Sequence, residues 1–230
     1  MKNKKESRRG QNSFGYQVIR FFFLKPVRLL FRVRSVNEEK LPKDGGYILC
    51  ANHTSMLDVL ILSVCNDRQI RYMAKAELFK IPLLRGLITF LGAYPVNRGG
   101  ADVRSIRQTI SLIEDGYAIG IFPQGTRHPG VDPAGTPVKS GVGMIAYHAK
   151  APIVPAYIRT KGNRVRMFRK TELVIGDPIP YDTLGFTKGG SKEYKAATEK
   201  VFSEICALGG YTRPLLADAA DSTANPEETL

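Results

Sequence analysis

The chain has 230 residues, 43% of them hydrophobic, and a formal net charge of +13. This length suits one domain with short appendages. The apolar fraction is enough for a large core, and the positive charge suits a polyanionic partner. No run reaches the roughly 18 apolar residues of a spanning helix, and Arg20, Lys25 and Arg28 interrupt the apolar stretch near the start, which argues against a secretory signal.

The cysteines and histidines give no sign of a metal centre. Three cysteines, at positions 50, 65 and 206, stand in apolar surroundings. This pattern predicts reduced core residues of a cytoplasmic protein rather than a disulfide framework. No cluster of His, Cys or Asp has the spacing of metal ligands, and the sequence has no Gly-x-x-x-x-Gly-Lys loop. We therefore expect neither a metal site nor nucleotide hydrolysis.

Positive charge is concentrated at the N-terminus. Residues 1–34 hold ten Lys or Arg and one Glu, whereas residues 214–230 hold four acidic residues and no basic one. We expect residues 1–11 to form a disordered basic tail and residues 212–230 a disordered acidic tail. Residues 12–36 are predicted to form an amphipathic segment of one or two short helices that associates with a membrane.

The predicted helices of this segment separate apolar from basic side chains. Projected at about 100° per residue, the apolar group falls within about 120° of arc, opposite the basic group. The apolar group is Phe22, Phe23, Pro26, Leu29, Leu30 and Val33, and the basic group is Lys25, Arg28 and Arg32. Such a helix suits a membrane interface with anionic head groups. A helix packed on the domain with a solvated basic face, or a nucleic-acid contact, would have the same composition.

Residues 37–211 are predicted to form one α/β domain. Strand-like and helix-like stretches alternate, which favours a largely parallel, twisted sheet flanked by helices. The expected strands are 47–51, 70–74, 93–96, 118–122, 153–159 and 172–175. The expected helices are 55–64, 78–91, 103–115, 141–148 and 191–208, with Pro82 as a start or break within the second.

A histidine and a carboxylate lie five positions apart in Asn52-His53-Thr-Ser-Met-Leu-Asp58, directly after an expected strand. Residues five apart are separated by about 140° around a helix, so both side chains cannot project from one helical face. The simplest arrangement puts His53 in the strand-to-helix turn and Asp58 in the helix, facing back, with Thr54 or Ser55 as the N-cap. His53 would then be a general base oriented by Asp58, and the substrate would supply the hydroxyl.

Cationic residues follow three of the expected strands. Lys75 and Arg98 each come directly after a strand, and the turn Phe122-Pro-Gln-Gly-Thr-Arg127 ends in a guanidinium. Gly125 permits a close backbone approach, while Thr126 and Arg127 present donors that suit a phosphate. Each of these residues could instead be solvated surface. Because ligands gather at the carboxyl ends of parallel strands, we expect the cations to meet the histidine at one edge.

Four sequence blocks, in order, resemble the lysophosphatidic acid acyltransferase family, also called 1-acylglycerol-3-phosphate O-acyltransferases. The blocks are residues 52–58, 92–98, 122–128 and 152–156. The first is the family's Asn-His-x-Ser-x-x-Asp pattern, the second a strand ending in Arg, the third a Phe-Pro-x-Gly-Thr-Arg turn and the fourth an apolar strand with a central proline. The similarity covers about residues 41–180.

The resemblance implies a glycerolipid acyltransferase-like fold with His53 as the base and Asp58 as its partner. The substrate-binding residues it implies are Lys75, Arg98, Gly125, Thr126 and Arg127. The reaction would move a fatty acyl group from acyl-acyl carrier protein or acyl-CoA to the sn-2 hydroxyl of 1-acylglycerol 3-phosphate, giving phosphatidic acid. Neither a bound cofactor nor a metal is implied. The protein would lie at the cytoplasmic face of the cell membrane, as a peripheral or monotopic protein.

Two positions depart from the family pattern. Gln124 stands where the family has Glu, and His128 replaces a small hydroxyl residue. If the Glu anchors the turn through hydrogen bonds, Gln preserves that role, whereas if its charge orients an arginine, the acceptor preference changes. The alternatives are acyl transfer to another lysophospholipid or a lyso-aminolipid, and a non-catalytic membrane-binding relative. A nucleic-acid binder is disfavoured because no reading motif is recognisable.

Overall fold

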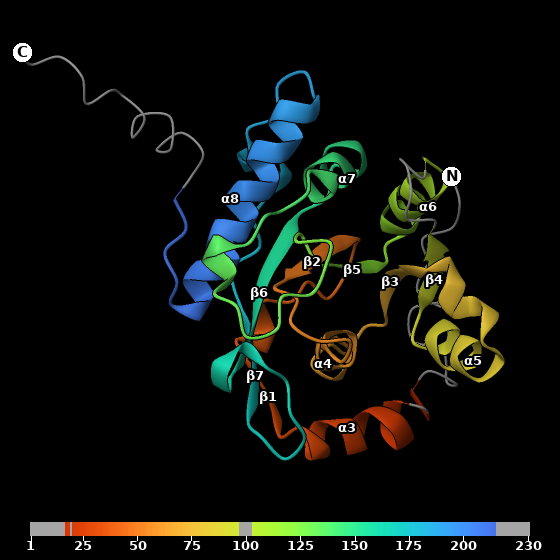
Figure 1. Ribbon diagram of the computed structural model, residues 1–230. Helices are drawn as coiled ribbons and strands as arrows, with labels where there is room; N and C mark the ends of the chain where they lie inside the picture. Colours follow the sequence, from red (N-terminus) through yellow and green to blue (C-terminus); the bar gives the residue numbers. More distant parts are fainter. Residues whose placement is uncertain (1–16, 19, 97–102, 215–230) are drawn as a thin grey trace, which may run out of the picture.

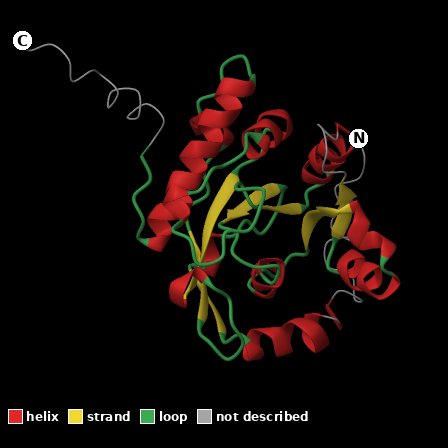
Figure 2. Cartoon of the chain, in the orientation of Figure 1, coloured by secondary structure: helices red, strands yellow, loops and turns green. Residues whose placement is uncertain are grey.

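The computed structural model describes residues 17–18, 20–96 and 103–214. In this part of the chain a seven-stranded sheet runs through the molecule and carries helices on both faces (Figure 1; Figure 2). The strands are β1 (Val33–Val36), β2 (Tyr47–Ala51), β3 (Ile70–Lys75), β4 (Ala93–Val96), β5 (Ala118–Ile121), β6 (Ile153–Thr160) and β7 (Thr171–Ile175). Their order across the sheet is β1-β7-β6-β2-β5-β3-β4.

The sheet is parallel except at one end. From β6 to β4 every neighbouring pair is parallel, so these five strands share one carboxyl edge. The strand β7 is antiparallel to β6 and parallel to β1, so both run against the rest. The prediction of a largely parallel sheet flanked by helices is confirmed.

The described residues also form six named α-helices and six short helical turns before, between and after the strands. The α-helices are α3 (Lys25–Leu30), α4 (Asp58–Val64), α5 (Pro82–Phe90), α6 (Val103–Glu114), α7 (Gly141–Ala149) and α8 (Ser191–Gly209). The short turns are η1 (Arg20–Leu24), η2 (Glu38–Lys40), η3 (Ala76–Lys80), η4 (Pro133–Gly135), η5 (Lys161–Asn163) and η6 (Tyr181–Leu184).

The alternation of side chains along β2 creates two cores. Tyr47 and Leu49 pack with α3 and α4 on one face of the sheet, whereas Ile48 and Cys50 pack with α6, α7 and α8 on the other. All five residues of β2 are buried, as expected for a central strand covered on both faces. This strand delivers the histidine to the carboxyl edge.

Two expected helices differ from the structure by more than one residue. The helix expected over 55–64 begins at Asp58, because the preceding residues form the turn that wraps its carboxylate. The helix expected over 78–91 is divided, since Pro82 lacks the N–H that a continuous helix would need and instead starts α5 after η3. The other expected helices and strands agree with the structure to within one residue at each end.

The N-terminal segment differs from its expected form at its end. Val33 and Arg34 lie in strand β1, which pairs with β7, rather than in an amphipathic helix. Val33 is buried in the core and cannot belong to a membrane-facing group. The four-residue strand was too short to stand out beside the helical pattern. Phe22 and Leu29 are exposed, as a surface-binding helix would require.

Arg213 extends the folded domain beyond its expected end at residue 211. Its guanidinium forms an ion pair with Glu199 at 2.8 Å and donates to the carbonyl oxygens of Ala134 and Thr136. Residues 1–16 and 215–230, which include all of the expected N-terminal tail and most of the expected C-terminal tail, lie outside the described residues.

The cysteines are free and buried, as the apolar surroundings predicted. Burial raises the pKa of the Cys65 thiol to about 12 and that of Cys206 to about 11, which makes both poor nucleophiles. Among the described residues, no helix combines the length and apolar character needed to cross a bilayer.

Candidate active site

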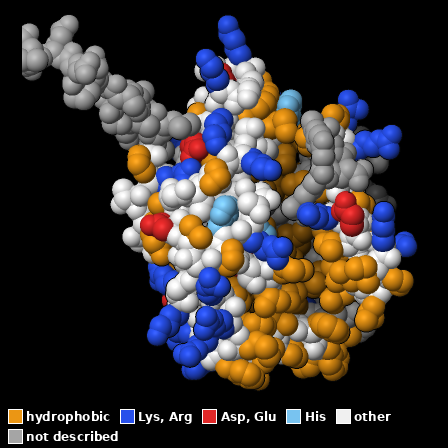
Figure 3. Space-filling view, viewed as in Figure 1, with side chains coloured by type: hydrophobic (Ala, Val, Ile, Leu, Met, Phe, Trp, Pro, Cys, Tyr) orange, Lys and Arg blue, Asp and Glu red, His pale blue; other side chains and the backbone are white. Residues whose placement is uncertain are grey.

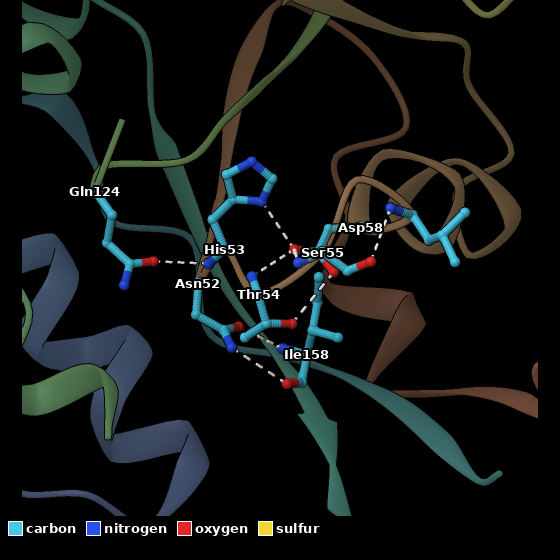
Figure 4. A network of polar contacts seen from close by, with 8 residues as sticks. Asn52, His53, Thr54, Ser55, Asp58, Gln124 and Ile158 are labelled. Atoms are coloured by element: carbon cyan, nitrogen blue, oxygen red, sulfur yellow. Dashed lines mark hydrogen bonds and ion pairs between the residues drawn. The ribbon is translucent and has the colours of Figure 1, made fainter. Parts of the chain in front are cut away.

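His53 and Asp58 meet in the turn between β2 and α4. The ring Nδ1 of His53 lies 2.8 Å from Oδ2 of Asp58 (Figure 4). The same carboxylate oxygen accepts the backbone N–H groups of Thr54 at 2.7 Å and Ser55 at 2.8 Å. Asp58 is fully buried, so these donors replace the water it would otherwise bind. The predicted contact between ring and carboxylate is present, with Asp58 as the first residue of its helix.

The contacts of His53 with Asp58 and Phe122 determine the tautomer and the orientation of its neutral ring. An ionised carboxylate can only accept hydrogen bonds, so in the neutral imidazole that a general base requires, Nδ1 carries the proton and donates it to Oδ2. Nε2 then has a free lone pair. The ring also stacks on Phe122, with centroids 4.0 Å apart and an interplanar angle of 11°. The carboxylate and the aromatic face together restrict the ring to one orientation.

The expected N-cap role of Thr54 or Ser55 is wrong. The helix begins at Asp58 with Leu57 as the N-cap residue, and no side chain caps it there. Instead, the carboxylate of Asp58 accepts the turn's N–H groups, and Ser55 Oγ accepts from the N–H of Leu57 at 3.2 Å. A negative charge in the first turn of α4 is favourable in the helix dipole. The aspartate therefore organises the turn as well as the histidine.

Asn52 extends the sheet beyond the last residue of β2. Its side-chain Oδ1 accepts from the N–H of Ile158 at 2.7 Å, and its Nδ2 donates to the carbonyl oxygen of the same residue at 3.3 Å (Figure 4). The amide imitates a strand residue while the backbone turns away from β6. This role was missed in the sequence, although the resemblance marks Asn52 as the first position of its block.

Gln124 links the histidine turn to the loop that carries η4. Its Oε1 accepts from the His53 N–H at 2.7 Å (Figure 4). Its Nε2 donates to Thr136 Oγ1 at 2.7 Å. Thr136 in turn donates to the carbonyl oxygen of Pro133 at 2.7 Å. Both Gln124 and Thr136 are buried. Gln124 therefore anchors the turn through hydrogen bonds, and among the described residues neither of its side-chain hydrogen bonds involves an arginine.

The turn after β5 lies against the histidine turn. Gly125 has a φ of +69°, and a Cβ there would lie 2.9 Å from the side chain of Lys139, so glycine fits both the backbone and the space. The N–H of His128 donates to the carbonyl oxygen of His53 at 2.8 Å. Thr126 and Arg127, between these two anchors, are exposed.

Lys75 lies at the same edge of the sheet. The register Cys50↔Ile121, continued by three residues, puts His53 opposite Gln124. The register Tyr72↔Gly120, continued in the same way, puts Lys75 opposite Pro123. Strands β2 and β3 flank β5, so their ends are about 10 Å apart. Lys75 is exposed and lies at the end of β3, as expected. Arg98, the other expected phosphate ligand, lies outside the described residues.

The site as described is an imidazole–carboxylate pair beside exposed cations. Neither Lys75 nor Arg127 has an ion-pair partner in the part of the chain that the structure describes. Within the same residues no group of three His, Cys, Asp or Glu could hold a metal ion. The arrangement can remove a proton from a hydroxyl next to a bound anion.

The chain matches the family described as Acyltransferase over residues 32–159, more than half of its length. A 1-acyl-sn-glycerol-3-phosphate acyltransferase of Bacillus subtilis is 34% identical over 175 residues, covering 75% of this chain and 85% of that protein. The chain belongs to the 1-acylglycerol-3-phosphate acyltransferase family. The resemblance seen in the four motifs is thereby confirmed, and the protein is an acyltransferase.

Two further comparisons define the extent of this similarity. A 1-acyl-sn-glycerol-3-phosphate acyltransferase of Streptococcus pneumoniae is 31% identical over 122 residues, covering 52% of this acyltransferase and 44% of that protein. The crystal structure of the 1-acyl-sn-glycerophosphate acyltransferase of Thermotoga maritima matches with a TM-score of 0.59 at 23% identity, covering 92% of this chain and 84% of that chain. The latter likeness shows a shared fold.

Gln124→Glu is expected to lower stability without changing the acceptor preference. The carboxylate could still accept from the His53 N–H, but Thr136 would have to turn its only hydroxyl proton from Pro133 to the new acid. We expect a loss of about 1–3 kcal/mol in the free energy of unfolding at neutral pH, recovered in part in acid, where protonated Glu can donate. Thermal unfolding against pH and relative rates with several lysolipids would measure both effects. A changed acceptor preference with unchanged stability would mean that Gln124 contacts substrate.

Proposed function

We propose that the protein transfers a fatty acyl group from an acyl thioester to the sn-2 hydroxyl of 1-acylglycerol 3-phosphate. The observation that carries this proposal is the His53–Asp58 pair at the carboxyl edge of the sheet, with the exposed cations Lys75 and Arg127 at the same edge. The relatives named 1-acyl-sn-glycerol-3-phosphate acyltransferase support the same reaction.

The proposed chemistry needs one base and no protein nucleophile. His53 Nε2 takes the proton of the acceptor hydroxyl as its oxygen attacks the thioester carbonyl carbon. Asp58 stabilises the imidazolium that forms. The tetrahedral intermediate then collapses, the carbon–sulfur bond breaks, and the departing thiolate takes the proton from the imidazolium. The products are phosphatidic acid and the free thiol of the carrier, either acyl carrier protein or CoA.

Lys75, Arg127 and the backbone at Gly125 are proposed to bind the phosphate of the acceptor. A guanidinium offers a fork of donors that matches phosphate oxygens, and an ammonium adds a point charge. Thr126 supplies a hydroxyl between the two anchored ends of its turn. Arg98 stays a proposed fifth contributor from the sequence.

The lipid surface is the proposed source of the acceptor. Helix α5 has no buried residue although its sequence, Pro-Leu-Leu-Arg-Gly-Leu-Ile-Thr-Phe, is mainly apolar. Met56, in the histidine turn, is also exposed. Figure 3 shows hydrophobic side chains gathered on the side of the molecule that carries α3 and α5. A continuous apolar surface of this kind favours a peripheral position at a membrane.

Arg127→Ala tests the phosphate site. We expect KM for 1-acylglycerol 3-phosphate to rise about 10-fold or more, with a smaller change in kcat, because the lost contact serves substrate and transition state alike. Initial rates against acceptor concentration would measure this. The matched control is Lys192→Ala, which removes an exposed cation at the start of α8. An unchanged dependence on acceptor concentration would remove Arg127 from the site.

Product analysis would identify which lysolipid accepts the acyl group and which thioester donates it. Purified protein would be given acyl-CoA or acyl-acyl carrier protein together with a lysolipid, and the labelled products would be resolved by thin-layer chromatography. The proposal expects phosphatidic acid as the main product. A main product from a lyso-aminolipid or from a lysolipid without a terminal phosphate would reassign the acceptor.

A further inference from the structure

The connection between β6 and β7 is basic and carries two exposed apolar residues. Residues 161–170 hold five Lys or Arg and no acidic residue. Met167 is 53% exposed and Phe168 is 69% exposed. The segment is held to the domain by Val165, which packs against the core. Single exposed apolar residues are ordinary, but an exposed Met-Phe pair among cations on an anchored loop needs a reason.

The tip of this connection is a tight turn with an arginine at each end. The N–H of Arg169 donates to the carbonyl oxygen of Arg166 at 3.3 Å, which closes a β-turn around Met167 and Phe168. Phe168 has a φ of +59°, a conformation that glycine or asparagine adopts more easily. An aromatic residue is thus held out to solvent at a position where the backbone favours a small one. Strain of this kind is found where a side chain has a task.

The turn is joined to the exposed apolar face of the N-terminal helices. The N–H of Phe168 donates to the carbonyl oxygen of Leu30 at 2.7 Å, at the end of α3. The neighbouring Leu29 is 80% exposed. Figure 1 shows the connection between β6 and β7 reaching down to α3. The exposed apolar residues of the turn and of α3 therefore lie on neighbouring segments, although they are far apart in the sequence.

The charges around the turn indicate which class of partner this surface can bind. Arg166 and Arg169 are exposed and have no ion-pair partner within the described ranges, whereas Lys170 is paired with Glu172 at 2.7 Å. Figure 3 shows Lys and Arg side chains bordering the hydrophobic area on the side of this connection. Apolar side chains flanked by free cations complement an acyl boundary covered by anionic head groups. A protein partner would need acidic residues around an apolar pocket, and duplex nucleic acid would have to be unstacked before Met and Phe could enter between its base steps.

We propose that the turn of residues 166–169 is a second membrane contact, in which Met167 and Phe168 enter the acyl boundary and Arg166 and Arg169 bind anionic head groups. Together with the exposed face of α3 it forms a two-point attachment that fixes how the domain sits on the bilayer. The inference rests on the proposed lipid surface, but it is tested by binding alone, without acyl donor or acceptor.

The absence of tryptophan from the chain allows a direct test. Phe168→Trp adds one fluorophore and keeps an aromatic residue at the tip. With phosphatidylcholine vesicles containing phosphatidylglycerol, we expect a blue shift and quenching by brominated acyl chains, and with phosphatidylcholine alone a much weaker response. The matched control is Lys192→Trp at the start of α8, which Figure 1 places at the opposite end of the molecule from α3, and which should show neither effect.

A second set of variants separates the ring and the charges from folding. Phe168→Gly suits the backbone better, so its thermal stability should equal or exceed that of the parent while its vesicle affinity falls about 10-fold. Arg166→Gln with Arg169→Gln should lose affinity for anionic vesicles about 10-fold or more. Arg107→Gln with Lys192→Gln, an equal loss of charge, should lose much less.

Two outcomes would overturn the proposal. One is parental vesicle binding by the variants of the turn. The other is a fluorescence response of the Phe168→Trp variant to duplex DNA but not to vesicles. A parent protein that binds vesicles through this turn but transfers no acyl group would instead refute the proposed function alone.

Discussion

His53→Ala is expected to lower kcat for acyl transfer by about 10²- to 10⁴-fold, the usual contribution of a positioned general base. The variant removes the only group that the structure brings, within the described residues, to the carboxyl edge with a free imidazole lone pair oriented by a carboxylate. Release of free thiol from acyl-CoA in the presence of 1-acylglycerol 3-phosphate would measure the rate.

The fold should survive this substitution. Asp58 would keep the N–H groups of Thr54 and Ser55, so its carboxylate would not be left without donors. We expect a small change in Tm, unchanged vesicle binding, and partial recovery of activity on adding imidazole, which can enter the space beside Phe122. The control is His148→Ala, on α7. Near-normal turnover of His53→Ala in a folded protein would refute the assigned base.

Asp58→Ala and Asp58→Asn are expected to separate two roles of one carboxylate. In Asp58→Asn the amide oxygen can take the place of Oδ2 and still accept from the ring and from both backbone N–H groups. The amide nitrogen then replaces Oδ1, so the Thr54 hydroxyl, which donates to Oδ1 at 3.5 Å, would have to accept instead, and the main loss is the charge. We expect about 10²-fold lower kcat and nearly parental stability, because the imidazolium formed in the reaction loses its counter-charge.

Asp58→Ala removes the acceptor as well as the charge. The buried N–H of Thr54, the part-buried N–H of Ser55 and the ring Nδ1 would lose their partner. We therefore expect a loss of about 2–5 kcal/mol in the free energy of unfolding and a fall in kcat of about 10³-fold or more. Denaturant unfolding and initial rates for the two variants would show the difference. Equal activity of Asp58→Asn and the parent would mean that the carboxylate only shapes the turn.

The parts of the site that could be predicted from sequence are those that a strand and its end determine. The apolar run of β2 and the pair His53 and Asp58 directly after it were enough to predict the turn and the contact between the two side chains. The parallel sheet placed Lys75 at the same edge because parallel strands share one carboxyl end. These inferences needed only periodicity and the order of elements.

The parts that were not predicted depend on contacts between distant segments. Gln124 joins His53 to Thr136, and the sequence alone allowed either role for it, because Gln and Glu differ in charge but not in shape. The short strand β1 forms only because β7 lies beside it. Asn52 completes the sheet through a side chain, which no strand pattern can show. In each case the decisive partner is far away in the chain.

Because His53 directly follows the middle strand, its position determines how thermal unfolding affects activity. β2 is hydrogen-bonded on one side to β5 and on the other to β6, and its residues are buried on both faces. Such a strand opens only when the whole sheet opens, whereas peripheral helices and loops fray earlier. Loss of the base's alignment and cooperative melting of the sheet are therefore one event, while attachment to lipid can weaken at lower temperature with the chemistry still intact.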